Sequence, residues 1–112
     1  MNKGDIILVN FPFTIPAQSK VRPALVLTET IDRFHDILVC AISSVVPVHP
    51  SEREIVLKES DPDFAQTGLR VSSVIKVDRM ATLRQSDSIA VIGNCSPQQW
   101  RLVVAAFRSL VS

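Results

Sequence analysis

The chain has 112 residues and a net charge of +1, with 46% hydrophobic and 21% charged residues. This length predicts one domain over residues 1–112. A mean hydropathy of +0.25 excludes a disordered chain, which needs low hydrophobicity and high net charge. The near-neutral charge excludes a histone-like nucleic-acid binder, although twelve Lys and Arg residues are enough for a local basic groove.

Neither export, membrane insertion nor metal binding is predicted. The N-terminal Met-Asn-Lys-Gly-Asp lacks the apolar region of a secretory signal, and no apolar run approaches the roughly 18 residues of a membrane span. Cys40 lies in an apolar run typical of a core strand, and Cys95 is the only other cysteine. Two cysteines and two histidines are too few for a disulfide scaffold or a structural zinc site. We therefore expect a cytoplasmic protein without a metal or a cofactor.

Short apolar runs punctuate the chain. Each is rich in Val, Ile and Leu and has the length of a strand: 6–9, 24–27, 37–42, 55–57, 74–77 and 89–92. Six short strands without helix-sized connections predict an antiparallel barrel or sandwich. The connecting segments 12–21, 44–53 and 58–71 are long enough to carry binding residues.

A single helix is predicted at the end of the chain. Ser96 is suited to the N-cap, Pro97 to the first helical position and Gln99 to the third. Apolar residues then recur with helical spacing at Trp100, Val103, Val104, Phe107, Leu110 and Val111. We expect this face to pack on the sheet.

Several polar residues are candidates for chemistry. Pro23 holds the backbone of Arg22 in an extended conformation. The planar guanidinium of Arg22 could bind a phosphate or pair with a surface carboxylate. Ser43 and Ser44 end an apolar run, where a hydroxyl bonds the local backbone or donates to a phosphate. His35 and His49 could form a general acid and base pair for RNA cleavage, but both lie in polar segments that favour solvated surface histidines. The acidic residues are scattered, which disfavours a two-metal nuclease.

Four segments in order carry a family resemblance: Gly4-Asp5-Ile6-Ile7, Arg22-Pro23-Ala24-Leu25-Val26-Leu27, Cys40-Ala41-Ile42-Ser43-Ser44, and the stretch from Gly68 to Lys76. With the final helix, they resemble the MazF/PemK family of type II toxin–antitoxin toxins over essentially the whole chain. The resemblance implies a mainly β fold, an SH3-like antiparallel β-barrel of the CcdB/PemK type with a C-terminal α-helix. It also implies a symmetric homodimer, which the high apolar content favours.

The implied activity is metal-independent, sequence-specific cleavage of single-stranded mRNA. The 2′-hydroxyl attacks the phosphate and leaves a 2′,3′-cyclic phosphate and a 5′-hydroxyl end. By the resemblance, the catalytic pair is Arg22 and Ser43, with Ser44 as a one-residue alternative. Ser43 stands where Thr is commoner in the family, and it keeps the hydroxyl. The implied partner is a cognate antitoxin with an acidic, partly disordered tail.

Further contacts to RNA are expected from charge and position in the chain. The expected residues are Phe13, Thr14, Lys20, Ser73, Lys76, Arg79, Thr82 and Arg84. The segment from Thr14 to Val21 lacks the glycines that the family usually carries there, and Pro16 stiffens it.

Two other functions are compatible with this fold. A gyrase poison of the CcdB type goes with a C-terminal Trp-Gly-Ile, whereas this chain ends in Leu110-Val111-Ser112. A barrel that binds RNA or protein without catalysis is the other alternative. Retention of Arg22 and Ser43 argues against it.

Overall fold

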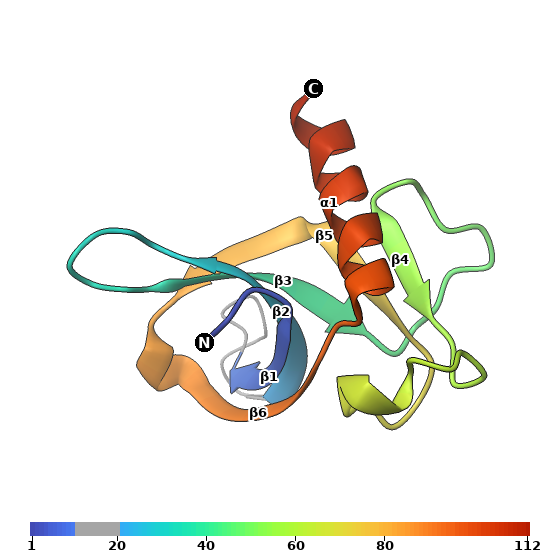
Figure 1. Ribbon diagram of the computed structural model, residues 1–112, viewed down its shortest axis with the longest axis horizontal. Helices are drawn as coiled ribbons and strands as arrows, with labels where there is room; N and C mark the ends of the chain where they lie inside the picture. Colours follow the sequence, from blue (N-terminus) through green and yellow to red (C-terminus); the bar gives the residue numbers. More distant parts are fainter. Residues whose placement is uncertain (11–20) are drawn as a thin grey trace.

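A computed structural model describes residues 1–10 and 21–112. It contains six strands and one α-helix in the predicted order (Figure 1). The elements are β1 (Asp5–Asn10), β2 (Val21–Glu29), β3 (Ile37–Ser43), β4 (Glu54–Leu57), β5 (Ser73–Leu83), β6 (Ser88–Asn94) and α1 (Pro97–Val111), with short 3-10 helices η2 (Ala65–Thr67) and η3 (Gln85–Asp87). The mainly β class with a C-terminal helix is therefore confirmed.

All six strands form one antiparallel sheet in the order β4-β5-β3-β2-β1-β6. The sheet curves strongly, and β1, β2 and β6 curl round on one side of the molecule (Figure 1). Among the described residues, β4 and β6 are the two edges and do not pair with each other. The hydrogen-bonded ladder is thus an open, curled sheet, which differs in this detail from the predicted barrel.

β5 is much longer than the apolar run 74–77 predicted. It continues to Leu83 because β3 pairs with both of its halves, although Asp78 and Arg79 interrupt the apolar pattern. The register jumps from Cys40↔Met80 to Ala41↔Lys76, so three residues of β5 bulge between these pairs. Such a bulge bends a strand and lets one strand serve two parts of a curved sheet.

The central strands β1, β2 and β3 bury residues on both faces, which explains their apolar runs, whereas the edge strand β6 is largely exposed. One face packs Leu25, Ile42 and Ile75 against Val103 of α1. A second cluster of buried residues consists of Ile7, Val9, Ala24, Val26, Ile37, Val39 and Leu83. Alternate residues of one strand belong to the two clusters, because successive side chains of a strand point to opposite faces of the sheet.

The start of α1 is fixed as predicted. The Gln99 amide donates to the Ser96 hydroxyl at 3.1 Å, and the Ser96 amide donates back to the Gln99 side chain at 2.8 Å. This capping box satisfies two amides that a helix start otherwise leaves free. Val103 and Ala106 are the buried apolar positions of the helix, whereas Val111 is 63% exposed and does not join the packed face.

No helix within residues 1–10 and 21–112 is long and apolar enough to cross a membrane.

Candidate functional site

A cleft of about 640 Å³ opens beside the first residues of β2. We call it the Arg22 cleft. The opposite wall is the segment that follows η2. The described residues that line it are Leu8, Val21, Arg22, Pro23, Ile42, Ser44, Gly68, Leu69, Arg70, Val71, Ser73 and Ile92.

The charged residues of this lining are two arginines, Arg22 and Arg70, and both are exposed. Within residues 1–10 and 21–112, the single ion pair joins the Met1 amine to Glu29 at 3.3 Å. Residues 11–20 contain no Asp or Glu. Two guanidinium groups beside a cleft without a carboxylate favour an anionic ligand, and their planar donor arrays match a phosphate.

The sequence around Pro23 positions Arg22. Arg22 lies opposite Val9, and Pro23 lies opposite Leu8 of β1. Proline fixes its own φ and keeps the preceding residue extended, so the expected extended conformation of Arg22 agrees with its place in β2. Ala24 follows and is fully buried. The guanidinium is therefore carried by a strand that is anchored immediately beside it.

Two serines meet this end of β2. The register Ala24↔Ala41, continued by two residues, puts Arg22 opposite Ser43 at the end of β3. The Ser43 hydroxyl accepts a hydrogen bond from the Val45 amide at 3.1 Å, which leaves its own hydrogen free to donate. Ser44 is exposed and lines the Arg22 cleft. The fold thus brings Arg22 and Ser44 to the same cleft, and Ser43 directly precedes Ser44 at the end of β3.

Ser73 also lines the cleft, but it is only 3% exposed. Its hydroxyl donates to the Val71 carbonyl at 2.8 Å. The hydroxyl hydrogen expected to meet RNA is therefore already used within the protein.

Lys76 lies on the same sheet face as Ser43. It is half-buried and pairs with Ala41 on one side and Glu54 on the other. The Ser51 amide lowers the pKa of the Glu54 carboxyl by hydrogen bonding to it, and Lys76 contributes a smaller electrostatic effect. Lys76 therefore stands beside a carboxylate that remains ionised at neutral pH.

Arg79, Thr82 and Arg84 are not brought to the Arg22 cleft. RNA contacts were expected of these residues from their charge and their position in loops, but Arg79 and Thr82 lie on β5. Thr82 pairs with Leu38, on the sheet face opposite to that of Ser43, and Arg84 follows the end of β5. The seven residues of β3 separate this end of the sheet from Ser43 by roughly 20 Å.

Phe13, Thr14 and Lys20 lie outside the described residues.

The histidines and cysteines stand apart from the Arg22 cleft. His35 and His49 are exposed, and neither belongs to the described lining. Burial raises the pKa of Cys40 to about 12 and that of Cys95 to about 11. Both thiols stay protonated at neutral pH and are poor nucleophiles. Cys40 is fully buried, which confirms its predicted place in the core.

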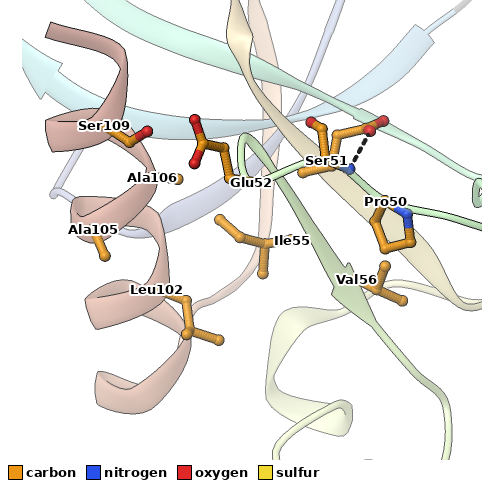
Figure 2. A pocket seen from close by; sticks show the side chains of 10 residues that line it. Pro50, Ser51, Glu52, Ile55, Val56, Leu102, Ala105, Ala106 and Ser109 are labelled. Atoms are coloured by element: carbon orange, nitrogen blue, oxygen red, sulfur yellow. Dashed lines mark hydrogen bonds between the residues drawn. The ribbon is translucent and has the colours of Figure 1, made fainter.

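A second pocket, of about 480 Å³, lies between α1 and β4. Figure 2 shows Leu102 and Ala105 on the helix side and Ile55 and Val56 on the strand side. Glu52 also lines this pocket, so its charge disfavours a phosphate.

No group of three or more His, Cys, Asp or Glu residues that could hold a metal ion is found in the part of the chain that the structure describes.

Comparison with protein families identifies the fold and its relatives. Residues 2–111 match the model of the PemK-like, MazF-like toxins of type II toxin–antitoxin systems. The chain belongs to this family. No curated protein sequence matches it.

Solved structures of MazF toxins share its fold. The Mycobacterium tuberculosis toxin MazF-mt6 is similar with a TM-score of 0.71 at 23% identity, over 96% of this chain and 95% of that one. MazF from Deinococcus radiodurans has a TM-score of 0.66 at 21% identity, over 97% and 93%. A mycobacterial endoribonuclease in complex with its cognate antitoxin has a TM-score of 0.70 at 13% identity, over 97% and 92%.

In this MazF-like toxin, Arg70 lines the Arg22 cleft although the sequence did not predict it as a site residue. It lies in a connection between strands, where a single arginine has no periodic pattern around it. The sequence feature nearest to Arg70 is Gly68, two residues earlier. In the structure Gly68 has a φ of 73° and forms a turn. Only the folded chain brings Arg70 to the same cleft as Arg22.

Proposed function

We propose that this MazF-like toxin is an endoribonuclease that cleaves single-stranded mRNA in the cytoplasm at a short sequence, without a metal ion. The observation that supports it is the Arg22 cleft, whose described lining carries Arg22, Arg70 and the exposed Ser44 and contains no carboxylate. RNA carries its own nucleophile in the 2′-hydroxyl, so the protein needs to orient the phosphate and stabilise negative charge.

In the proposed reaction, the 2′ oxygen attacks phosphorus and the bond from phosphorus to the 5′ oxygen breaks. The proton lost from the 2′-hydroxyl is balanced by the one that the 5′ oxygen gains. Arg22 binds the charge that develops on the phosphorane and on the leaving oxygen. Ser43 donates a hydrogen bond to a non-bridging oxygen. The products are a 2′,3′-cyclic phosphate and a 5′-hydroxyl end.

The test is an incubation of the purified protein with a long single-stranded RNA in EDTA. We expect cuts at a recurring short sequence, with cyclic phosphate ends identified by mass spectrometry. Cleavage that appears only when magnesium is added would contradict the proposal. No cleavage, together with trapped gyrase–DNA complexes, would favour the gyrase poison. RNA binding without cleavage would favour a binding module.

The two serines make separable predictions. Ser43→Ala is expected to lower kcat by about a hundredfold, as expected for loss of one donor to a developing oxyanion. Ser44→Ala, the matched control one residue away, should retain activity close to that of the unmodified protein. Single-turnover cleavage of one RNA oligonucleotide measures both. If Ser44→Ala shows the larger loss, Ser44 is the donor and the assignment to Ser43 is wrong.

An antitoxin with an acidic tail is the proposed partner, because its carboxylates would complement Arg22 and Arg70. The mycobacterial relative solved with its cognate antitoxin supports this proposal.

A homodimer is the proposed assembly. A groove beside α1 is lined almost entirely by apolar side chains, among them Leu27, Leu38, Trp100, Val104 and Phe107. A second copy placed on this face would bury it, and stable interfaces bury about 800 Å² on each partner.

Replacing Val104 with glutamate is expected to convert the dimer to a monomer, because an unpaired carboxylate would be buried in the interface. Sedimentation at micromolar concentration measures the change as a halving of the mass. Gln98→Glu, at an exposed position of the same helix, is the control and should remain dimeric. A monomeric unmodified protein would contradict the assembly.

A further inference from the structure

The wall of the Arg22 cleft that carries Arg70 is held in place by buried hydrogen bonds. The Thr67 hydroxyl donates to the Phe64 carbonyl at 2.6 Å and accepts from the Leu69 amide at 3.2 Å. Thr67 is fully buried. The backbone that leads to Arg70 is therefore constrained up to the preceding residue.

The same wall is fixed against β6 by two glycines. A Cβ atom at Gly68 would clash with the Ile92 carbonyl, and one at Gly93 would clash with the backbone of Gln66 and Thr67. Only glycine permits backbones to approach this closely. Arg70 thus projects from a rigid segment, although its own side chain is exposed.

Two cations at one cleft repel each other unless anions lie between or beside them. Arg22 comes from β2 and Arg70 from the opposite wall, and both lack a carboxylate partner in the described residues. An RNA strand supplies a phosphate at every nucleotide. The cleft volume of about 640 Å³ falls within the range of roughly 300–1,000 Å³ that is typical of ligand pockets.

We propose that Arg70 binds the phosphate next to the scissile one and so sets the position of the RNA strand in the cleft. This inference rests on the proposed function, in which Arg22 takes the scissile phosphate. Arg70 then contributes to binding of the ground state and the transition state alike. Its loss should raise KM and leave kcat nearly unchanged.

The experiment uses Arg70→Ala with an RNA oligonucleotide that spans a mapped cut site. A 2′-deoxy substitution at the cut nucleotide prevents cleavage and allows the Kd to be measured. We expect Kd and KM to rise about tenfold, with kcat changed less than threefold. The slope of log Kd against log salt concentration should fall by about 0.7, the value for one phosphate contact to a single strand.

Two further variants separate a phosphate contact from a general effect of charge or folding. Arg101→Ala removes one positive charge from an exposed position on α1, outside the cleft, and should leave the salt slope unchanged. Arg70→Lys keeps the charge and should restore most of the slope. A structural role for Arg70 would alter the free energy of unfolding but not this slope.

Neutral methylphosphonate linkages locate the contact. One oligonucleotide carries the substitution on the phosphate before the scissile one, and another carries it on the phosphate after. The Arg70→Ala penalty should disappear on one of these two oligonucleotides and persist on the other. An equal penalty on both would overturn the assignment to a neighbouring phosphate.

The outcomes distinguish this inference from the proposed function. If the protein cleaves RNA and Arg22→Ala abolishes cleavage, an unchanged Kd and salt slope in Arg70→Ala overturns the inference alone. If the protein does not cleave RNA, the proposed function fails, and the place of Arg70 beside a scissile phosphate fails with it.

Discussion

Replacing Arg22 with alanine is expected to lower kcat/KM for RNA cleavage by about a thousandfold, or roughly 4 kcal/mol of transition-state stabilisation. The reason is the negative charge that accumulates on the phosphorane in a cleft where Arg70 is the one other cation of the described lining. The loss should fall on kcat more than on KM, because Arg22 acts on charge that is absent from the ground state.

Two control variants define what Arg22 supplies. Arg22→Lys retains a positive charge without the planar pair of donors, so we expect an intermediate loss of about ten- to a hundredfold. Arg101→Ala removes an exposed arginine of α1 and should cut RNA normally. Cleavage by Arg22→Ala at close to the unmodified rate would show that the Arg22 cleft is not the active site.

Gly68→Ala is expected to destabilise the fold by about 3–5 kcal/mol, because two penalties combine. Gly68 has a φ of 73°, which strains any residue with a side chain, and the added Cβ would clash with the Ile92 carbonyl of β6. The neighbouring backbone cannot yield easily, since Thr67 is fully buried and hydrogen-bonded. Urea denaturation gives the free energy of unfolding directly.

Gly4→Ala is the matched control. Gly4 has a φ of 89°, but its nearest neighbours lie 3.7 Å or more from the position of an added Cβ. Only the backbone strain remains, so the expected loss is about 1–2 kcal/mol. Equal losses in the two variants would show that the close approach of β6 to the cleft wall adds no stability.

The strands and the helix were predictable because local signals specified them. Short runs of Val, Ile and Leu gave all six strands, and Ser96, Pro97 and Gln99 gave the start of α1. The length of β5 was not predictable. Its polar second half is held in the sheet by pairing with the start of β3, and a bulge between the two halves has no mark in the sequence.

The site was predictable in part. The extended conformation of Arg22 follows from Pro23, and the place of the two serines follows from the end of an apolar run. Charge and position in the chain do not show which part of the sheet a residue reaches. The strand register places Thr82 opposite Leu38, at the end of β3 far from Ser43, and Arg84 follows the end of β5. The sequence also does not show whether a serine hydroxyl is already hydrogen-bonded within the protein. The Ser73 hydroxyl is bonded to the Val71 carbonyl.

The length and composition of the sequence predicted one apolar domain, and the Arg22-Pro23 motif pointed to a phosphate ligand. The tertiary structure added how that modest charge is used. Strand pairing carries Arg22 to one wall of a cleft, and two glycines let the other wall approach β6 and present Arg70. These contacts join residues far apart in the chain, so no local pattern encodes them. A net charge of +1 for the whole chain is therefore compatible with a local positive charge from Arg22 and Arg70 at this cleft.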